Sequence, residues 1–200
     1  IRDSTDQEKL MQRLKGLAQS GDWWVLAGSL PPGVSSSFYA EMITILQSKG
    51  VRVFLDTSDK ALLLSCKAEP FLVKPNADEA RELTGLPVED TAEIAFAARA
   101  IQTMGPKNVI VSLGRKGALL TNGSKSWMAT SPEIIECNPI GAGDSMVAGL
   151  IWGLSRGYSM PEALRTGVAC GAASASLPGT AVGSLELVHK LSTQVKLKEI

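Results

Sequence analysis

Two glycines and one carboxylate stand together in the stretch Asn138-Pro139-Ile140-Gly141-Ala142-Gly143-Asp144. The apolar positions of a helix follow directly: Met146, Val147, Leu150, Ile151 and Leu154. Glycines let successive backbone N–H groups turn toward one point, and a helix N-terminus adds partial positive charge there. The pattern predicts a hole for an anion such as a phosphoryl group in transfer, with Asp144 placed to take the proton of an attacking hydroxyl. The alternative is a plain turn in which Asp144 caps the helix.

Four continuous apolar runs precede this stretch, with helical segments between them. The runs cover residues 23–27, 51–55, 71–73 and 109–113. Such runs are typical of parallel strands covered on both faces, so we predict an α/β fold with a mostly parallel sheet between helices. The expected helices cover residues 10–18, 38–47, 60–64, 77–83 and 91–104, and Gly85 and Pro87 stop the fourth of them.

The pattern changes after residue 113. Residues 117–121 and 126–129 alternate as strands do, with Asn122-Gly123 as a hairpin turn, so we expect an antiparallel edge. The last third predicts helices over residues 144–157, 160–176 and 185–196. Residues 169–176 are almost all small, which suits either tight helix packing or a nucleotide pocket.

Composition places the chain among globular proteins with a small partner. Hydrophobic residues make up 44% of the 200 residues and charged residues 20%, which disfavours both disorder and a membrane span. Basic and acidic residues are equal in number, so charge favours neither nucleic acid nor a membrane surface. Cys66, Cys137 and Cys170 lack metal-like spacing and fit a reducing, cytoplasmic compartment. We expect one domain over residues 1–200.

A second group of polar residues follows the run 71–73. Lys74 offers a point charge to phosphate, while Asn76 and Glu79, three residues apart, share one helical face and can hold a hydrated Mg²⁺ through water. An N-terminal capping box, Asn76 with Glu79, explains the same spacing. Asp56, at the end of the run 51–55, can orient Lys74 or a substrate hydroxyl, or else cap the following turn.

Two glycine loops end other strands. Ser112-Leu113-Gly114-Arg115-Lys116-Gly117 allows backbone N–H groups to approach a triphosphate, although a hairpin with two positional glycines is the alternative. Gly28-Ser29-Leu30-Pro31-Pro32-Gly33 forms a stiff turn at the edge where an acceptor substrate would bind. His189, the one histidine, lies among apolar residues of the last helix, so we assign it no catalytic role.

Taken in order, four motifs resemble those of the ribokinase/PfkB sugar kinases, in the branch of 1-phosphofructokinases, minor 6-phosphofructokinases and tagatose-6-phosphate kinases. The motifs are Gly28-Ser-Leu-Pro-Pro-Gly33, Lys74-Pro-Asn-x-x-Glu79, Ser112-Leu-Gly-x-x-Gly117 and Gly141-Ala-Gly-Asp144. The resemblance implies a ribokinase-like three-layer α/β sandwich, ATP as donor, and direct in-line transfer to a sugar-phosphate hydroxyl.

The resemblance also implies a role for each matching residue. Asp144 matches the catalytic base, and the amides of Gly141, Ala142 and Gly143 match the anion hole. Asn76 and Glu79 match the pair that governs Mg²⁺ and phosphate. The nucleotide side is matched by Lys74, Ser112, Gly114 and Gly117, while Val168, Cys170, Gly171 and Ser174 fall where relatives line the adenine or a nearby cation loop.

The chain departs from the family pattern in two places. Members are longer, and their amino-terminal part supplies lid strands, an acidic sugar-binding residue and a glycine pair. The chain lacks an initial methionine and a targeting segment, and it starts with the polar stretch 1–7, so we expect residues to precede Ile1. We expect residues 1–200 to be the carboxyl-terminal, nucleotide-binding part of such a kinase. This part alone should be deficient in sugar binding. Many relatives have Asp-Thr where this chain has Asn138-Pro139, which leaves dependence on K⁺ open. Asn-Pro at this place resembles the tagatose-6-phosphate kinases.

The predicted activity is ATP-dependent phosphorylation of a ketohexose phosphate to the bisphosphate and ADP. Fructose 1-phosphate, fructose 6-phosphate and tagatose 6-phosphate are the candidate substrates. The alternatives are a kinase of an unphosphorylated sugar or nucleoside, and a nucleotide-binding module without activity. We expect ATP and Mg²⁺ as cofactors, no nucleic-acid or membrane partner, and a cytoplasmic homodimer of the full-length protein.

Overall fold

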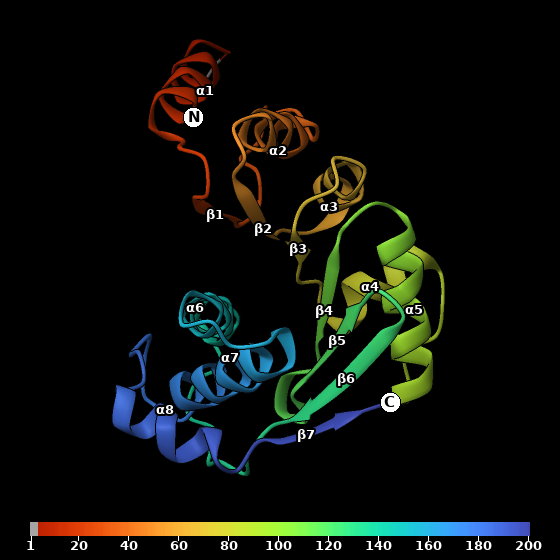
Figure 1. The fold of residues 1–200 in the computed structure, drawn as a ribbon, viewed down its shortest axis with the longest axis vertical. Helices are drawn as coiled ribbons and strands as arrows, with labels where there is room; N and C mark the ends of the chain where they lie inside the picture. Colours follow the sequence, from red (N-terminus) through yellow and green to blue (C-terminus); the bar gives the residue numbers. More distant parts are fainter. Residues whose placement is uncertain (1–3) are drawn as a thin grey trace. The chain divides into compact units, whose positions relative to one another are not determined.

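The computed structural model describes residues 4–200, which form two compact units (Figure 1). The first unit comprises the described residues up to Val111 together with Thr121–Gly123, and the second comprises Ser112–Leu120 and Ser124–Ile200. Within residues 4–200, no helix combines the length and the apolar character that crossing a membrane requires.

The first unit is built on parallel strands in sequence order. The strands are β1 (Trp23–Ala27), β2 (Arg52–Asp56), β3 (Leu72–Val73) and β4 (Asn108–Ser112). The helices between them are α1 (Ser4–Leu17), α2 (Phe38–Ser48), α3 (Asp59–Cys66), α4 (Ala77–Thr84) and α5 (Thr91–Thr103). Val53, Phe54 and Leu55 of β2 are buried, as predicted for a parallel strand covered on both faces. The run 23–27 also forms a parallel strand, but Val25 of β1 is 44% exposed, so the expected double cover is wrong there.

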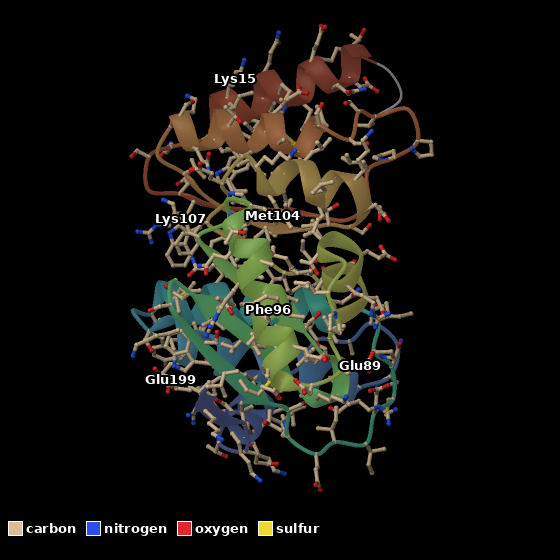
Figure 2. All side chains as sticks on the ribbon, turned by 90° about the vertical axis from the view of Figure 1, so that its right-hand side faces the viewer. Lys15, Glu89, Phe96, Met104, Lys107 and Glu199 are labelled. Atoms are coloured by element: carbon tan, nitrogen blue, oxygen red, sulfur yellow. The ribbon has the colours of Figure 1, made fainter. Side chains whose placement is uncertain are left out.

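The helices of the first unit turn their polar faces outward. In Figure 1, α1, α2 and α3 lie side by side, and the contacts of α2 with α1, with α3 and with β2 agree with that view. The outer face of α5 is seen in Figure 2, where Phe96 is an exposed aromatic side chain. The opposite face of α5 buries alanines and isoleucines, as its helical spacing predicts.

The second unit is mainly helical. It contains the short helix η1 (Gly114–Lys116), the first three residues of strand β5 (Ala118–Asn122), and strands β6 (Lys125–Thr130) and β7 (Lys196–Glu199). Its longer helices are α6 (Ala142–Ser155), α7 (Met160–Ala175) and α8 (Leu185–Ser192). Small residues let α6 and α7 approach closely: a Cβ on Gly149 would lie 2.5 Å from Cys170 Sγ, and one on Gly167 would lie 2.8 Å from Met146 O. The small-residue run of α7 therefore serves helix packing.

The structure corrects four expected boundaries. The last helix ends at Ser192 instead of residue 196, and β7 follows it, pairing antiparallel with β6. The turn after β5 consists of Gly123 and Ser124, because Asn122 still belongs to the strand. Helix α6 begins at Ala142, two residues earlier than expected. Helix α1 begins at Ser4, inside the stretch 1–7 expected to be merely polar, of which residues 1–3 lie outside the described residues.

Candidate active site

The glycine turn begins α6. Gly141 is the N-cap residue and has a left-handed backbone with φ of +82°, which favours glycine. Asp144 is the third residue of α6 rather than its cap, so the alternative in which Asp144 caps the helix is wrong. Its side chain is exposed and has no hydrogen bond or ion pair to any of residues 4–200. An unpaired carboxylate at a helix N-terminus is available to accept a proton.

The amides of this turn differ in availability. Ala142 N–H donates to Pro139 O at 3.1 Å, which occupies it in the turn. Within the described part of the chain, the N–H groups of Gly141 and Gly143 have no hydrogen-bond partner. The predicted three-amide hole is thus reduced here to two free amides, because closing the turn uses the third.

Helix α7 braces the first turn of α6. The hydroxyl groups of Ser145 and Ser174 share a hydrogen bond of 2.7 Å, and a Cβ on Gly171 would lie 3.0 Å from Ala142 O. Ser174 and Gly171, predicted to line a nucleotide site, therefore contact α6. Val168, predicted in the same group, is only 2% exposed and belongs to the core.

A cavity of about 530 Å³ lies beside Asp144 within the second unit. Three helices and two loops line it. The helices contribute Asp144, Ser145, Ala148, Gly149 and Trp152 from α6, Thr166 and Cys170 from α7, and Leu185, Val188, His189 and Ser192 from α8. Tyr158 comes from the loop between α6 and α7, and Val182 and Gly183 come from the loop between α7 and α8. The wall is mostly apolar with a few polar groups, as is usual for small-molecule sites. Of the four residues predicted on α7, Cys170 lines the cavity.

Most residues of this wall were not predicted from the sequence. His189 lines the cavity, and its ring meets that of Trp152 edge-on with 6.4 Å between centroids. Ser145, Gly149 and Trp152 follow one another at intervals of four and three residues, which places them on one face of α6. That spacing is the signal which could have found the wall.

Lys74, in the first unit, follows β3 and is held by a carboxylate. Its Nζ lies 3.1 Å from Asp56 Oδ1, and the two side chains are 8% and 20% exposed. Lys74 N–H also donates to Leu55 O at 3.0 Å, so backbone and side chain are both tied to β2. Of the roles left open for Asp56, the structure supports the one of orienting Lys74.

Asn76 and Glu79 form the capping box of α4. Asn76 N–H donates to Glu79 Oε2 at 2.7 Å, and Glu79 N–H donates to Asn76 Oδ1 at 2.9 Å. Burial raises the pKa of the Glu79 carboxyl, an effect that the Asn76 amide and the Lys74 charge partly offset. The structure therefore confirms the capping box, and Oε1 of Glu79 takes no part in it.

The donor set suits a hydrated cation rather than a directly bound one. Among residues 4–200, no three histidine, cysteine, aspartate or glutamate side chains gather as metal ligands. Glu79 offers one free carboxylate oxygen, and Mg²⁺ usually keeps several waters when bound by one or two carboxylates and substrate phosphates. Asn76 and Glu79 thus fit Mg²⁺ held through water.

The two strand-end loops are held by local contacts. Gly28 O accepts hydrogen bonds from Thr57 Oγ1 at 2.9 Å and from the Tyr39 hydroxyl at 3.1 Å, which fixes the start of the proline turn. In the second unit, the loop that starts at Ser112 and contains Gly114 is closed by a hydrogen bond from Leu113 N–H to Gly117 O at 2.9 Å. Gly117 has φ of +102°, and a Cβ there would lie 2.0 Å from Ala129 O. These values support the alternative in which Gly117 is a positional glycine of a hairpin.

The family model described as pfkB family carbohydrate kinase matches residues 2–186 of the chain. The chain is similar to 1-phosphofructokinase of Haemophilus influenzae, with 38% identity over 177 residues, 88% of this chain and 56% of the relative. It is also similar to 1-phosphofructokinase of Bacillus subtilis, with 34% identity over 195 residues, 98% of this chain and 63% of the relative.

Among solved structures, phosphofructokinase-2 from Escherichia coli superposes with a TM-score of 0.89 at 31% identity, over 96% of this chain and 62% of that chain. The likeness confirms the expected ribokinase-like α/β fold. The chain thus spans less than two thirds of the length of each of these relatives.

Proposed function

The chain belongs to the pfkB family of carbohydrate kinases, and from this premise we propose that it is the nucleotide-binding part of a kinase that phosphorylates a ketohexose phosphate with ATP. The candidate acceptors are fructose 1-phosphate, fructose 6-phosphate and tagatose 6-phosphate, and the products are the bisphosphate and ADP. The observation that carries the proposal is the unpaired Asp144 carboxylate, which follows the free amides of Gly141 and Gly143 in the chain and lines the apolar cavity.

In the proposed reaction, Asp144 accepts the proton of the acceptor hydroxyl as that oxygen bonds to the γ-phosphorus of ATP. The bond from this phosphorus to the β–γ bridging oxygen breaks, and ADP leaves with the electron pair. The amides of Gly141 and Gly143, at the positive end of α6, stabilise the charge on the transferred group. Gly171 and Ser174 keep this turn in place through their contacts with α6.

The adenine ring is assigned to the apolar cavity, where Cys170, Trp152 and His189 contribute to the wall. Lys74 supplies a fixed positive charge for phosphate oxygens, and Asn76 and Glu79 hold Mg²⁺ through water. When bound, Mg²⁺ neutralises charge on the phosphates. Ser112, Gly114 and Gly117 supply the backbone of a second loop on the nucleotide side.

The test uses the full-length protein that carries this sequence. A coupled assay of ADP release with each candidate sugar phosphate should show turnover with at least one, and no turnover above background with any of them contradicts the substrate class. Fructose, ribose and adenosine test the alternative of an unphosphorylated sugar or nucleoside. Tight binding of ATP without turnover on any acceptor would favour a nucleotide-binding module.

Assembly and compartment follow as further parts of the proposal. We expect the full-length protein to form a homodimer, to be measured by sedimentation equilibrium. A cytoplasmic location agrees with three cysteines that remain free thiols within the described residues. Dependence on K⁺ can be read from the same assay with K⁺ replaced by tetramethylammonium.

A further inference from the structure

The side chain of Asn138 joins two segments that are distant in sequence. Its Oδ1 accepts the N–H of Ile140 at 3.1 Å, and its Nδ2 donates to Gly179 O at 2.7 Å. A carbonyl can only accept and a backbone N–H can only donate, so both bonds require this one orientation of the amide. Asn138 therefore ties the start of the glycine turn to the loop that follows α7.

The surrounding backbone strengthens this junction. The N–H groups of Cys137 and Asn138 both donate to Ala175 O, at 2.8 and 3.1 Å, where α7 ends. The loop that holds Gly179 continues to Val182 and Gly183, which line the cavity. Gly183 in turn lies against α7, since a Cβ there would be 2.4 Å from that of Ala173. The Asn138 side-chain amide thus joins the turn before Asp144 to the loop that leads to the cavity wall, beside the two backbone bonds to Ala175.

We propose that Asn138 is a positioning residue that couples the loop wall of the cavity to the glycine turn, an inference that rests on the proposed function. A nucleotide seated against Val182 and Gly183 orders the Gly179 loop. Through the Asn138 amide this order reaches Ile140 and the free amides of Gly141 and Gly143. Asn138 touches no reacting atom and acts through the placement of these amides and of Asp144.

Two variants separate this coupling from local turn formation. Asn138→Asp keeps the oxygen that accepts Ile140 N–H but replaces the donor to Gly179 O with a second acceptor. Asn138→Ala removes both bonds. Asn108→Ala is the control, because Asn108 makes the same kind of bond, Nδ2 to Phe71 O at 2.8 Å, at the start of β4 in the first unit.

In the full-length enzyme, both Asn138 variants should lower kcat about tenfold and leave KM for ATP within about threefold, as expected for lost alignment in the transition state. Asn108→Ala should lower the melting temperature without lowering kcat. An Asn138→Asp enzyme with the kcat of the wild type overturns the proposal, because the local turn alone would then suffice. A loss confined to the melting temperature overturns it as well.

Hydrogen exchange on the 200-residue chain supplies a readout independent of turnover. In the wild type, the ATP analogue AMP-PNP with Mg²⁺ should slow exchange in the segment 137–142, and in Asn138→Asp this protection should be lost. Equal protection in both proteins overturns the inference. If AMP-PNP does not bind the wild type, the proposed function is contradicted. Exchange of the Ala142 amide without nucleotide then tests the role of Asn138 separately. Faster exchange in Asn138→Asp than in the wild type supports the inference about Asn138, and equal exchange overturns it.

Discussion

Asp56 and Lys74 meet at the ends of two neighbouring parallel strands, with 3.1 Å between the carboxylate and the ammonium group. Lys74 is almost fully buried, and a buried ammonium without a counter-ion is costly. Replacing Asp56 by Asn should lower the free energy of unfolding of the chain by about 1.5–3 kcal/mol, the range for a hydrogen bond to a charged group. Urea unfolding followed by circular dichroism measures it.

The control for this variant is Asp78→Asn, which removes an exposed ion pair with Arg81 and should cost less than about 0.5 kcal/mol. A double-mutant cycle of Asp56→Asn with Lys74→Met adds a stricter criterion, since strictly additive losses would show that the two side chains do not stabilise each other.

Asp144→Asn tests the proposed base. The change keeps the size of the side chain and removes its basic oxygen, so kcat of the full-length enzyme should fall by about 10²–10⁴-fold, the usual contribution of general-base catalysis. The affinity for ATP should barely change, because the amides of Gly141 and Gly143 remain in place. Steady-state kinetics with varied ATP measure both.

Glu162→Gln is the matched control, because Glu162 is also the third residue of its helix and the variant also removes one negative charge. It should leave kcat unchanged. Turnover of Asp144→Asn within threefold of the wild type would remove Asp144 from the mechanism.

Glu79→Gln separates capping from metal binding. Glutamine also serves as the third residue of a capping box, so Glu79→Gln should not lower stability near neutral pH, whereas Glu79→Ala should lose about 0.5–1 kcal/mol. The Mg²⁺ concentration needed for half-maximal turnover should rise in Glu79→Gln. An unchanged Mg²⁺ requirement together with weaker sugar binding would assign Glu79 to the sugar instead.

The raised pKa of Glu79 has a predictable effect on stability. A carboxyl whose pKa is higher in the folded state contributes stability that is fully present below its unfolded pKa and is lost as pH rises through its folded pKa. Glutamine cannot titrate, so Glu79→Gln should gain stability relative to the wild type as pH rises through that window. Unfolding of both proteins across acidic pH checks this, and parallel pH profiles would contradict it.

The three thiols should differ in reactivity according to their surroundings. Cys137 is exposed and should react first with a disulfide reagent, whereas burial raises the pKa of Cys66 to about 12 and should keep it inert in the folded chain. Burial also raises the pKa of Cys170, so its slow reaction should accelerate only at alkaline pH. Mass-spectrometric mapping of the modified residues measures each rate.

Cys170 also reports on the cavity. AMP-PNP with Mg²⁺ should slow its modification further, because a ring in the cavity would shield the thiol. The control is the same reaction with Mg²⁺ alone, which brings no ring to the cavity. Equal rates for Cys170 with and without saturating nucleotide would place the adenine elsewhere.

The sequence by itself determined those features that depend on neighbouring residues. Helix α4 begins with the box of Asn76 and Glu79 and ends at Gly85, whose φ of +69° needs a residue without a Cβ. The parallel strands were predictable because their runs are apolar on both faces, and the motifs fell at the strand ends. Each of these signals is contained within a few residues of chain.

The tertiary structure decided whatever depends on residues far apart in sequence. Residues 196–199 form a strand because β6 provides a partner, although their own pattern was compatible with the end of a helix. The cavity joins side chains of α6, α7 and α8, and only packing separates Cys170 on its wall from Val168 in the core. Likewise, Asp56 pairs with Lys74 because the register of β2 and β3 brings their ends together. Periodicity shows which face of an element is buried, but the partner on that face is selected by long-range contacts whose energy no local pattern contains.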